Sequence, residues 1–300
     1  MNDFIIPLSE EFEKIFFIKG ARNGKYPYSH SLLIEDCLID TGISTRLLRK
    51  LKREFQINKV FLSHWHEDHT SGNRLLKNAK FFIHKDDELL IKNVDKFDEY
   101  YGVSDTVAEE SVDWLMESLR LENTKIEKTL SNCEIIKIGV NYELEVIHTP
   151  GHTAGHCVFI ENNSKIAFLA DIDLTNFAFY AGIDSNLIDF EKSLDTVKDL
   201  DMEIAITSHL GVVKGSKEIK NALNNYHMVI NKRDQRILPF FSEVKPLAVE
   251  DLKNKNLIYK YYSDFKDYEI IAEMIMLQKH FDKFLVQELI KPKDNGFILN

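Results

Sequence analysis

Three imidazoles and a carboxylate fall within six residues of this 300-residue chain, directly behind a short apolar run. The segment FLSHWHEDHTSGN contains His64, His66, Asp68 and His69. In an extended chain the side chains of residues 64 and 66 point the same way. A turn after residue 66 can then aim Asp68 and His69 at a neighbouring position. Because imidazoles and carboxylates are ordinary metal ligands, the segment predicts a site that can supply ligands to two metal ions.

Three later segments repeat this design, in which a ligand-type side chain follows an apolar run. The segment LEVIHTPGHTAGH offers His152 after a Pro-Gly turn, KIAFLADIDL offers Asp171, and EIAITSHLG offers His209. A carboxylate that emerges from a run as apolar as IAFLA is costly unless it is paired or bound to a cation. This argument favours Asp171 as a ligand shared between metals, and Asp173 is a weaker candidate for the same role.

The rest of the pattern predicts a layered domain of strands and helices. Amphipathic helices are predicted at 44–56 and 189–200, where apolar side chains recur at helical spacing. Short apolar runs bounded by turn residues predict strands, and the mixture indicates an α/β or α+β fold. The predicted strands are 14–20, 31–36, 37–42, 59–64, 79–84, 144–151, 157–161, 165–171 and 203–209.

The candidate ligands all precede residue 212, so we expect two parts. Residues 1–212 form the ligand-bearing domain, and 213–300 form a mostly helical C-terminal module. Within the first part, the acidic segment at about 86–128 has a helical pattern and is predicted to be an insertion, either a lid or a packing element. In the C-terminal module the helical patterns lie at 216–235, 246–254 and 270–290.

Composition limits the classes of protein that remain. The net charge of −10, with 29% charged and 44% hydrophobic residues, is typical of a globular protein and excludes a disordered chain. Residues 212–300 carry +3 and the remainder −13, so neither part has the basic charge that holds proteins on nucleic acid. Nucleic acid is therefore an open but unfavoured partner, and a small molecule is the expected one.

The cysteines and the N-terminal residues indicate the cellular compartment. Cys37, Cys133 and Cys157 lie far apart beside apolar residues, so buried free thiols in a reducing compartment are expected. The N-terminus has acids where a signal peptide needs basic residues, and no run approaches the ~20 apolar residues of a membrane span. We expect a cytoplasmic protein with no membrane partner.

Five motifs together resemble the metallo-β-lactamase superfamily. They are DTG (40–42), HWHEDH (64–69), PGHTAGH (150–156), ADID (170–173) and SHLG (208–211). Their order matches the family's, and they span most of residues 12–211. The resemblance implies a four-layer αβ/βα sandwich with two metal ions at one edge of the sheets. It is nearest to the glyoxalase II-like and lactamase-like branch, whose members carry a helical, winged-helix-like C-terminal tail.

The resemblance also implies a role for each residue. His64, His66 and His152 would bind one metal, and Asp68, His69 and His209 the other, with Asp171 between them. Asp40 would support the metal loop by hydrogen bonds rather than ligate. Zinc suits this ligand set, and iron or manganese would fit the second position. Structural rather than ligand roles are expected for His30, His84, His148 and His156.

The chemistry expected of such a site is metal-assisted hydrolysis. A hydroxide held between the two metals would attack, and Asp68 would accept its proton. The PGHTAGH form favours a small ester or thioester substrate, as in hydroxyacylglutathione hydrolases. A phosphodiesterase or endoribonuclease is the first alternative, and a mononuclear-iron sulfur dioxygenase is the second. A non-catalytic module with structural metals is a further alternative, and a homodimer through the C-terminal module stays open.

Overall fold

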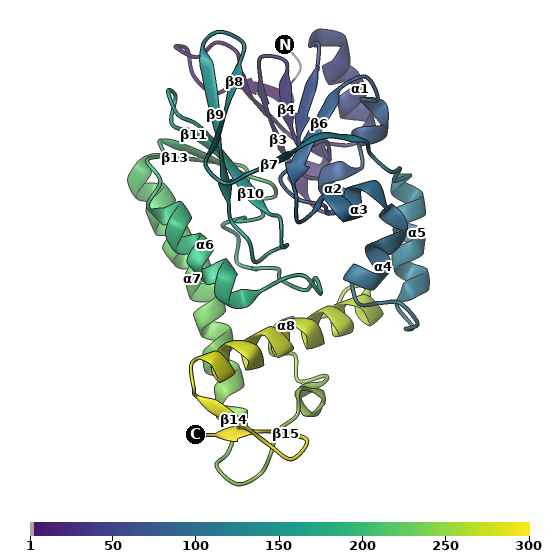
Figure 1. Cartoon of the computed structure of the whole chain (residues 1–300), viewed down its shortest axis with the longest axis vertical. Helices are drawn as coiled ribbons and strands as arrows, with labels where there is room; N and C mark the ends of the chain where they lie inside the picture. Colours follow the sequence, from purple (N-terminus) through teal and green to yellow (C-terminus); the bar gives the residue numbers. More distant parts are fainter. Residues whose placement is uncertain (1–2) are drawn as a thin grey trace.

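A computed structural model describes residues 3–300 and contains two β-sheets packed face to face (Figure 1). The first sheet has strand order β1-β2-β3-β4-β5-β6-β7. Neighbouring strands are antiparallel from β1 to β4 and parallel from β4 to β7. Its strands are β1 (Ile5–Pro7), β2 (Ile15–Ile18), β3 (Ser31–Ile34), β4 (Cys37–Ile39), β5 (Lys59–Phe61), β6 (Lys80–His84) and β7 (Ile126–Leu130).

The second sheet has strand order β13-β12-β11-β10-β9-β8. Its neighbouring strands are antiparallel except for β11 and β12, which run parallel. A separate hairpin pairs β14 with β15 near the C-terminus. The strands are β8 (Glu134–Ile138), β9 (Tyr142–His148), β10 (Cys157–Glu161), β11 (Ile166–Ala170), β12 (Ile204–Thr207), β13 (Val212–Lys214), β14 (Ile290–Lys293) and β15 (Gly296–Leu299).

Helices cover the outer faces of the two sheets (Figure 1). The early ones lie beside the first sheet, and α6 and α7 lie beside the second. The α-helices are α1 (Thr45–Glu54), α2 (Glu67–Thr70), α3 (Glu88–Lys92), α4 (Phe97–Tyr100), α5 (Glu109–Leu119), α6 (Leu187–Lys198), α7 (Ser216–Ile237) and α8 (Lys266–Val286). Short 3-10 helices are η1 (Ala21–Gly24), η2 (Asn73–Leu75), η3 (Val94–Lys96), η4 (Leu238–Phe240) and η5 (Val249–Leu252).

Three apolar clusters define the four layers. One cluster joins the inner faces of both sheets, where Phe61 from β5 meets Phe159 from β10 at a ring-centroid distance of 6.1 Å. A second joins the first sheet to α1 and α5, and a third joins the second sheet to α6, α7 and α8. Strand β2 shows how the sequence allows this: alternate residues of IFFI enter different clusters, and all four are buried. The predicted αβ/βα sandwich is confirmed.

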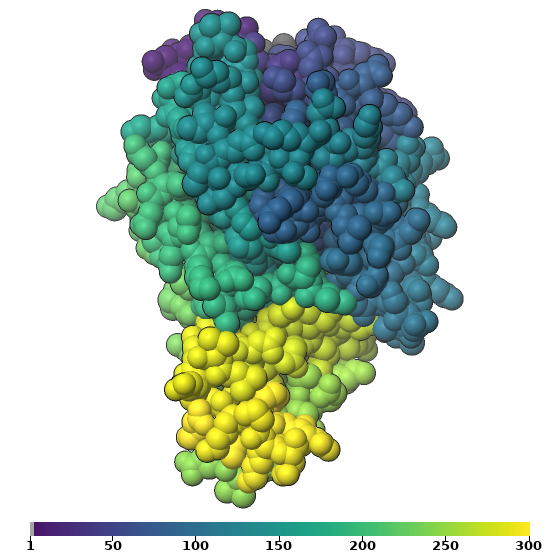
Figure 2. All heavy atoms as spheres, viewed as in Figure 1, coloured from purple at the N-terminus to yellow at the C-terminus, as the bar shows by residue number. Residues whose placement is uncertain are grey.

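Helix α8 lies across the bottom of the sandwich (Figure 1). Helix α8 crosses from the side of α6 and α7 to the side of α5, and it contacts all three (Figure 1). In the space-filling view the C-terminal atoms form the lower end of the molecule (Figure 2). Tyr268 of α8 packs against apolar residues of both outer clusters. The helical C-terminal region is present as expected, whereas its division from 1–212 as a separate domain stays a prediction.

Most predicted elements are present, and the differences have simple causes. All nine predicted strands form, as do the helices at 44–56 and 189–200, the first of which begins where Ser44 Oγ accepts a hydrogen bond from Leu47 N. Strands β1 and β13 were not predicted because each has only three residues. Strands β7 and β8 were not predicted because they are only partly buried, so their sequences mix polar and apolar residues. In the module, 246–254 contains only η5, and residue 290 already belongs to β14.

One expectation about the cysteines is wrong. Cys37 and Cys157 are buried free thiols as predicted, but Cys133 is exposed. It occupies the turn between β7 and β8 with a φ of 59°. The apolar residues beside it belong to β8, whose outer face is partly exposed. None of the helices within residues 3–300 has the length and apolar composition that crossing a membrane requires.

Candidate metal centre

All seven predicted ligands follow the carboxyl end of a strand. His64 and His66 lie after β5, and α2, which begins at Glu67, carries Asp68 and His69. The β9–β10 turn supplies the third imidazole, and the residues after β11 and β12 supply the remaining carboxylate and imidazole: His152, Asp171 and His209. The structure brings these side chains into two adjacent groups, one of His64, His66, His152 and Asp171, and one of Asp68, His69 and His209.

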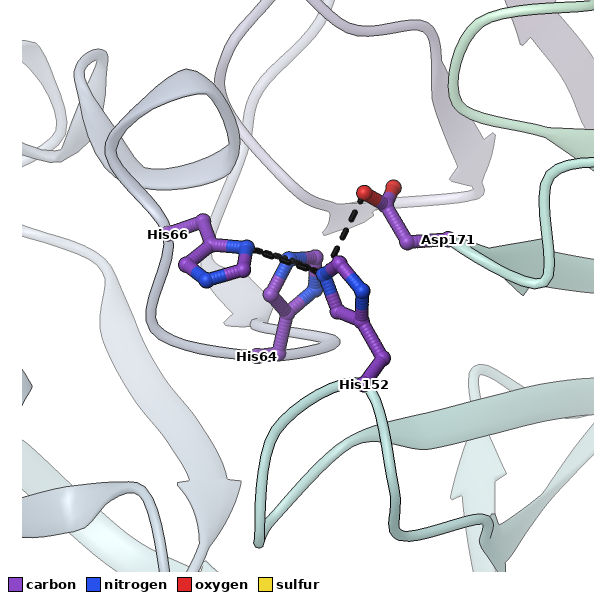
Figure 3. Close-up of side chains that lie close together, drawn as sticks. All are labelled: His64, His66, His152 and Asp171. Atoms are coloured by element: carbon purple, nitrogen blue, oxygen red, sulfur yellow. Dashed lines mark hydrogen bonds and ion pairs between the residues drawn. The ribbon is translucent and has the colours of Figure 1, made fainter. Parts of the chain in front are cut away.

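In the first group three ring nitrogens face one another (Figure 3). His66 Nδ1 lies 3.0 Å from His64 Nε2 and 2.9 Å from His152 Nε2, and the remaining separation is 3.2 Å. Three nitrogens cannot all satisfy one another by hydrogen bonds at such distances. Ligands of a tetrahedral ion with bonds of about 2.0–2.1 Å are about 3.3 Å apart. The spacing therefore fits three imidazole ligands of one ion.

In the second group, carboxylate oxygens and ring nitrogens converge. Asp68 Oδ2 lies 3.7 Å from His69 Nε2 and 3.3 Å from His209 Nε2. The group is nearly closed to solvent, since the His69 side chain is fully buried and that of His209 is 21% exposed. Two nitrogens and one carboxylate oxygen again form a donor set that suits a divalent ion.

Asp171 stands between the two groups. Its Oδ1 lies 3.0 Å from His69 Nε2. Its Oδ2 lies 3.3 Å from His152 Nε2 (Figure 3). The two oxygens of the Asp171 carboxylate therefore face different groups. This is the arrangement expected of a carboxylate shared between two ions.

Two of the rings that face the groups are oriented by a hydrogen bond from their other nitrogen to a backbone carbonyl. His152 Nδ1 lies 2.8 Å from Phe179 O, and His209 Nδ1 lies 2.6 Å from Gly24 O. Because a carbonyl can only accept, both rings donate through Nδ1, so Nε2 is the nitrogen that faces the groups. Such outer bonds are typical of metal-binding histidines.

Asp40 plays the same part for His69. Asp40 Oδ2 lies 2.7 Å from His69 Nδ1 and accepts a hydrogen bond from Ser63 Oγ at 2.7 Å, while Oδ1 accepts from Ser63 N at 2.8 Å. Asp40 is fully buried and lies behind the ring, outside both groups. Next to it, Gly42 is required by space, because a Cβ there would lie 1.4 Å from Asp68 O.

The pKa values of the histidines differ between the two groups. Burial lowers the pKa of His64 and His66, so both rings are neutral, the form that binds metal. At His209 burial acts in the same direction, but the carboxylates of Asp171, Asp173 and Asp68 prevail and raise the pKa to about 10. A negative potential that holds a proton on His209 also favours a divalent cation at this position.

The remaining candidates lie outside the two groups. Asp173 Oδ1 accepts a hydrogen bond from His209 N at 2.8 Å, so it faces the loop rather than the clustered side chains. His30 Nδ1 accepts from Gly20 N at 2.9 Å, and His156 Nε2 accepts from Asp171 N at 3.2 Å. His84 and His148 stack at a centroid distance of 3.8 Å away from the site, with Asp86 close by.

Sequence reasoning missed Asp87, a buried carboxylate that joins the two main ligand loops. Its Oδ2 accepts from Trp65 N at 3.1 Å and from Thr153 Oγ1 at 2.8 Å, and its Oδ1 accepts from Gly155 N at 2.6 Å. Asp184 adds a second link through Trp65 Nε1 and Ala154 N. Asp87 stands in an acidic stretch that read as a solvated helix, so nothing in the sequence distinguished it.

Glu67 was also missed, although it lies within HWHEDH. Its side chain is buried beside the second group, where Oε1 accepts from Tyr26 Oη at 2.6 Å and Oε2 accepts from Tyr101 Oη. Burial and the neighbouring Asp68 raise the pKa of Glu67 to about 7. Tyr101 comes from the 86–128 segment, and that segment therefore reaches the site.

Comparison with known proteins gives a consistent result. The family model described as the metallo-β-lactamase superfamily matches residues 29–106. A Drosophila melanogaster protein named β-lactamase-like protein 2 homolog is 26% identical over 68% of this chain and 61% of its own length. The hydroxyacylglutathione hydrolase GloC of Haemophilus influenzae is 27% identical over 44% of this chain and 57% of its own. The chain thus spans about six-tenths of the length of these two relatives.

Two further proteins extend the match. The human acyl-coenzyme A thioesterase MBLAC2 is 23% identical over 64% of this chain and 75% of its own length. A solved metallo-β-lactamase family protein from Thermus thermophilus superimposes with a TM-score of 0.66 at 16% identity, covering 99% of this chain and 97% of that one. The structural match includes the C-terminal helices. The chain thus matches the metallo-β-lactamase superfamily model over residues 29–106 and has the fold of a solved metallo-β-lactamase family protein.

Proposed function

We propose that this protein is a dinuclear metal-dependent hydrolase that cleaves a small ester or thioester. The observation that carries the proposal is the position of Asp171, whose two carboxylate oxygens face different groups at 3.0 and 3.3 Å. A carboxylate shared in this way is the feature that separates a two-ion site from two independent clusters of histidines. The ions would be held by His64, His66, His152, Asp68, His69, His209 and Asp171.

The chemistry follows from what these residues can do. Two divalent ions bound there would supply Lewis-acid polarisation of a carbonyl and a water of lowered pKa. Zinc is the proposed metal because imidazole and carboxylate ligands suit it. Asp68 lines the cavity beside the groups, so its carboxylate is placed to orient the attacking water and accept its proton. The Glu67–Tyr101 bond fixes the residue next to Asp68 and so helps to hold that carboxylate in place.

The proposed type of hydrolysed bond rests on the names of two relatives and on the charges of the residues that line the cavity. Two relatives are named as a hydroxyacylglutathione hydrolase and an acyl-coenzyme A thioesterase, which supports a thioester or ester. A phosphodiester of nucleic acid would need basic side chains to meet its phosphates. Among the described residues that line the cavity, Lys25 is the only lysine or arginine.

The test combines metal analysis with an assay panel. Purified protein is expected to contain close to two divalent ions per chain, and to hydrolyse a thioester or ester but not a phosphodiester or RNA. Chelation should abolish that activity, and adding metal back should restore it. Oxygen uptake with a persulfide substrate, or cleavage of RNA alone, would contradict the proposal. A protein with full metal content but no turnover of any of these would instead indicate structural metals.

A further inference from the structure

A cavity of about 550 Å³ lies beside the two groups. His66, Asp68, Asp171 and His209 line part of it, so the cavity is continuous with the candidate metal centre. From there it reaches α5 and the beginning of α8. Its volume falls in the ~300–1,000 Å³ range of small-molecule sites. A substrate that reacts at the metal centre therefore has to place its remaining atoms in this cavity.

The walls away from the metal centre are apolar. Helix α5 contributes Val112, Leu115 and Met116, the first two of which are at most 8% exposed. Phe179 stands at the boundary, with its ring centroid 6.0 Å from those of both His66 and His152. Burial against such walls favours an aliphatic chain by about 25 cal/mol per Å² of apolar surface.

The C-terminal helix completes the cavity. Tyr268 of α8 meets Tyr101 edge-on at a centroid distance of 5.8 Å, and Tyr101 donates a hydrogen bond to Glu67. Tyr259 adds a further aromatic wall by packing on Phe177 at 5.0 Å. Tyr101 therefore connects the α8 wall of the cavity to the metal-binding segment.

The acidic side chains on the walls disfavour an acyl chain that ends in a negative charge. Glu67, Asp173 and Glu269 line the cavity in addition to the two candidate ligand carboxylates. Lys25, the one lysine or arginine among the described lining residues, is exposed. An acyl chain with a negative end would lie among these carboxylates without a buried cation to pair with it.

We propose that this cavity binds the uncharged aliphatic acyl chain of the substrate, with the scissile carbonyl at the metal centre and the chain between α5 and α8. The inference rests on the proposed function and narrows it to medium-chain acyl esters or thioesters. Each methylene buried on binding is worth about 0.8 kcal/mol, or about fourfold in kcat/KM.

The first experiment varies only the acyl group. Metal-loaded full-length protein is assayed with the p-nitrophenyl esters of acetate, butyrate and octanoate, and with the p-nitrophenyl monoester of suberate, which has the length of octanoate but ends in a carboxylate. We expect kcat/KM for octanoate to exceed that for butyrate by at least about tenfold, and the suberate ester to fall below butyrate. A flat series, or equal turnover of octanoate and suberate esters, overturns the inference and leaves the hydrolase assignment intact.

The second experiment does not depend on turnover. Calorimetry measures the binding of octanamide and butanamide, which keep the carbonyl and the chain but resist hydrolysis. We expect octanamide to bind at least about tenfold more tightly. If no ester or thioester is hydrolysed but this preference holds, the proposed function fails and the cavity assignment stands. Equal binding of the two amides rejects the cavity assignment.

A matched pair of variants on α5 locates the effect. Met116 lines the cavity, and Met116→Trp should lower the octanoate-to-butyrate ratio of kcat/KM by about tenfold or more, because the larger ring occupies the space of the chain. Trp114 lies two residues away, is 63% exposed and does not line the cavity, so Trp114→Ala should keep the ratio. Metal content shows that each variant is folded. An unchanged ratio in Met116→Trp would place the chain elsewhere.

Discussion

Asp40 Oδ2 lies 2.7 Å from His69 Nδ1, and this contact turns His69 Nε2 toward Asp68 and Asp171. An asparagine at position 40 would keep the size of the side chain but lose the carboxylate charge and one acceptor. We expect Asp40→Asn to weaken metal binding by about 10- to 100-fold while the chain stays folded. Metal titration against a competing chelator, with circular dichroism as the folding control, tests this. Unchanged affinity would mean that Asp40 does not orient the ring.

The proposed ligands themselves should matter more. We expect His66→Ala or Asp171→Ala to lower metal affinity by more than about 100-fold, above the effect of supporting residues, and to abolish hydrolysis. His227→Ala is the matched control, because this histidine of α7 faces Glu191 at 3.3 Å, away from the site. Metal content and turnover of the three purified variants decide the matter. Full activity in either ligand variant would contradict the assignment.

Removal of the metals should lower stability. An ion that binds only the folded chain stabilises it by about 4 kcal/mol when its concentration is a thousandfold above Kd. Chelation should therefore lower the Tm of the wild-type protein by several degrees, and by less in His66→Ala. Differential scanning calorimetry with and without chelator measures both shifts. Equal shifts in the two proteins would show that His66 holds no ion.

Asp87 should be critical for stability although it is not a candidate ligand. Its replacement by alanine leaves Trp65 N, Thr153 Oγ1 and Gly155 N without their acceptor in a buried position. Each buried unsatisfied group costs about 1–3 kcal/mol, so we expect Asp87→Ala to lower the free energy of unfolding by at least about 3 kcal/mol. The neighbouring Asp86 has a side chain that is 42% exposed, and Asp86→Ala should cost far less. Urea denaturation compares the two.

A buried ion cluster fixes the C-terminal helices. Lys283 of α8 is 3% exposed, and its Nζ lies 2.6 Å from Glu191 of α6 and 2.7 Å from Asp234 of α7. Lys283→Ala removes the lysine that both carboxylates share, leaving each with only a histidine partner, and should cost about 3–5 kcal/mol of unfolding free energy. Lys77→Ala breaks an exposed pair with Glu122 and should cost at most about 1 kcal/mol. Similar losses in the two variants would contradict this view of the cluster.

The same cluster predicts acid sensitivity. Burial alone would raise the pKa of Asp234 and Glu191, but hydrogen bonds and charges from His280, His227 and Lys283 prevail and lower both. A carboxylate whose folded-state pKa is lowered contributes stability above its unfolded value of about 4, and loses it as the pH falls through the folded value. We expect Asp234→Asn to be less stable than wild type at neutral pH, with the difference shrinking in acid. Urea titrations across this range measure it.

How much of the site could be predicted from the sequence depends on the chemical type of each side chain and on the residues around it. The seven side chains that the structure brings together could be found in the sequence because histidines and carboxylates are unusual directly behind apolar strands. Asp87 could not, because it stands in an acidic stretch and only the tertiary fold carries it to Trp65 and Gly155. Glu67 could not be identified either, because only the tertiary fold brings Tyr26 and Tyr101 to its carboxylate.

The strands likewise divide into those that could be predicted from the sequence and those that could not. Strands such as β10 and β11 are buried along their whole length, so their apolar runs identified them. Strands β7 and β8 expose part of their residues, and their mixed sequences gave no such signal. The position of α8 beneath both halves could not be read from its sequence, because an amphipathic helix does not specify which surface it will cover.

Tyr268 packs against both halves of the sandwich and also lines the cavity. The proposed metal ligands come from strand ends, whereas the far wall of the cavity comes from α5 and α8. The proposed ligands and the proposed binding site for the acyl chain are therefore encoded in different stretches of the gene. Substitutions in the last third of the chain can retune which molecules are accepted while the reactive core is inherited unchanged.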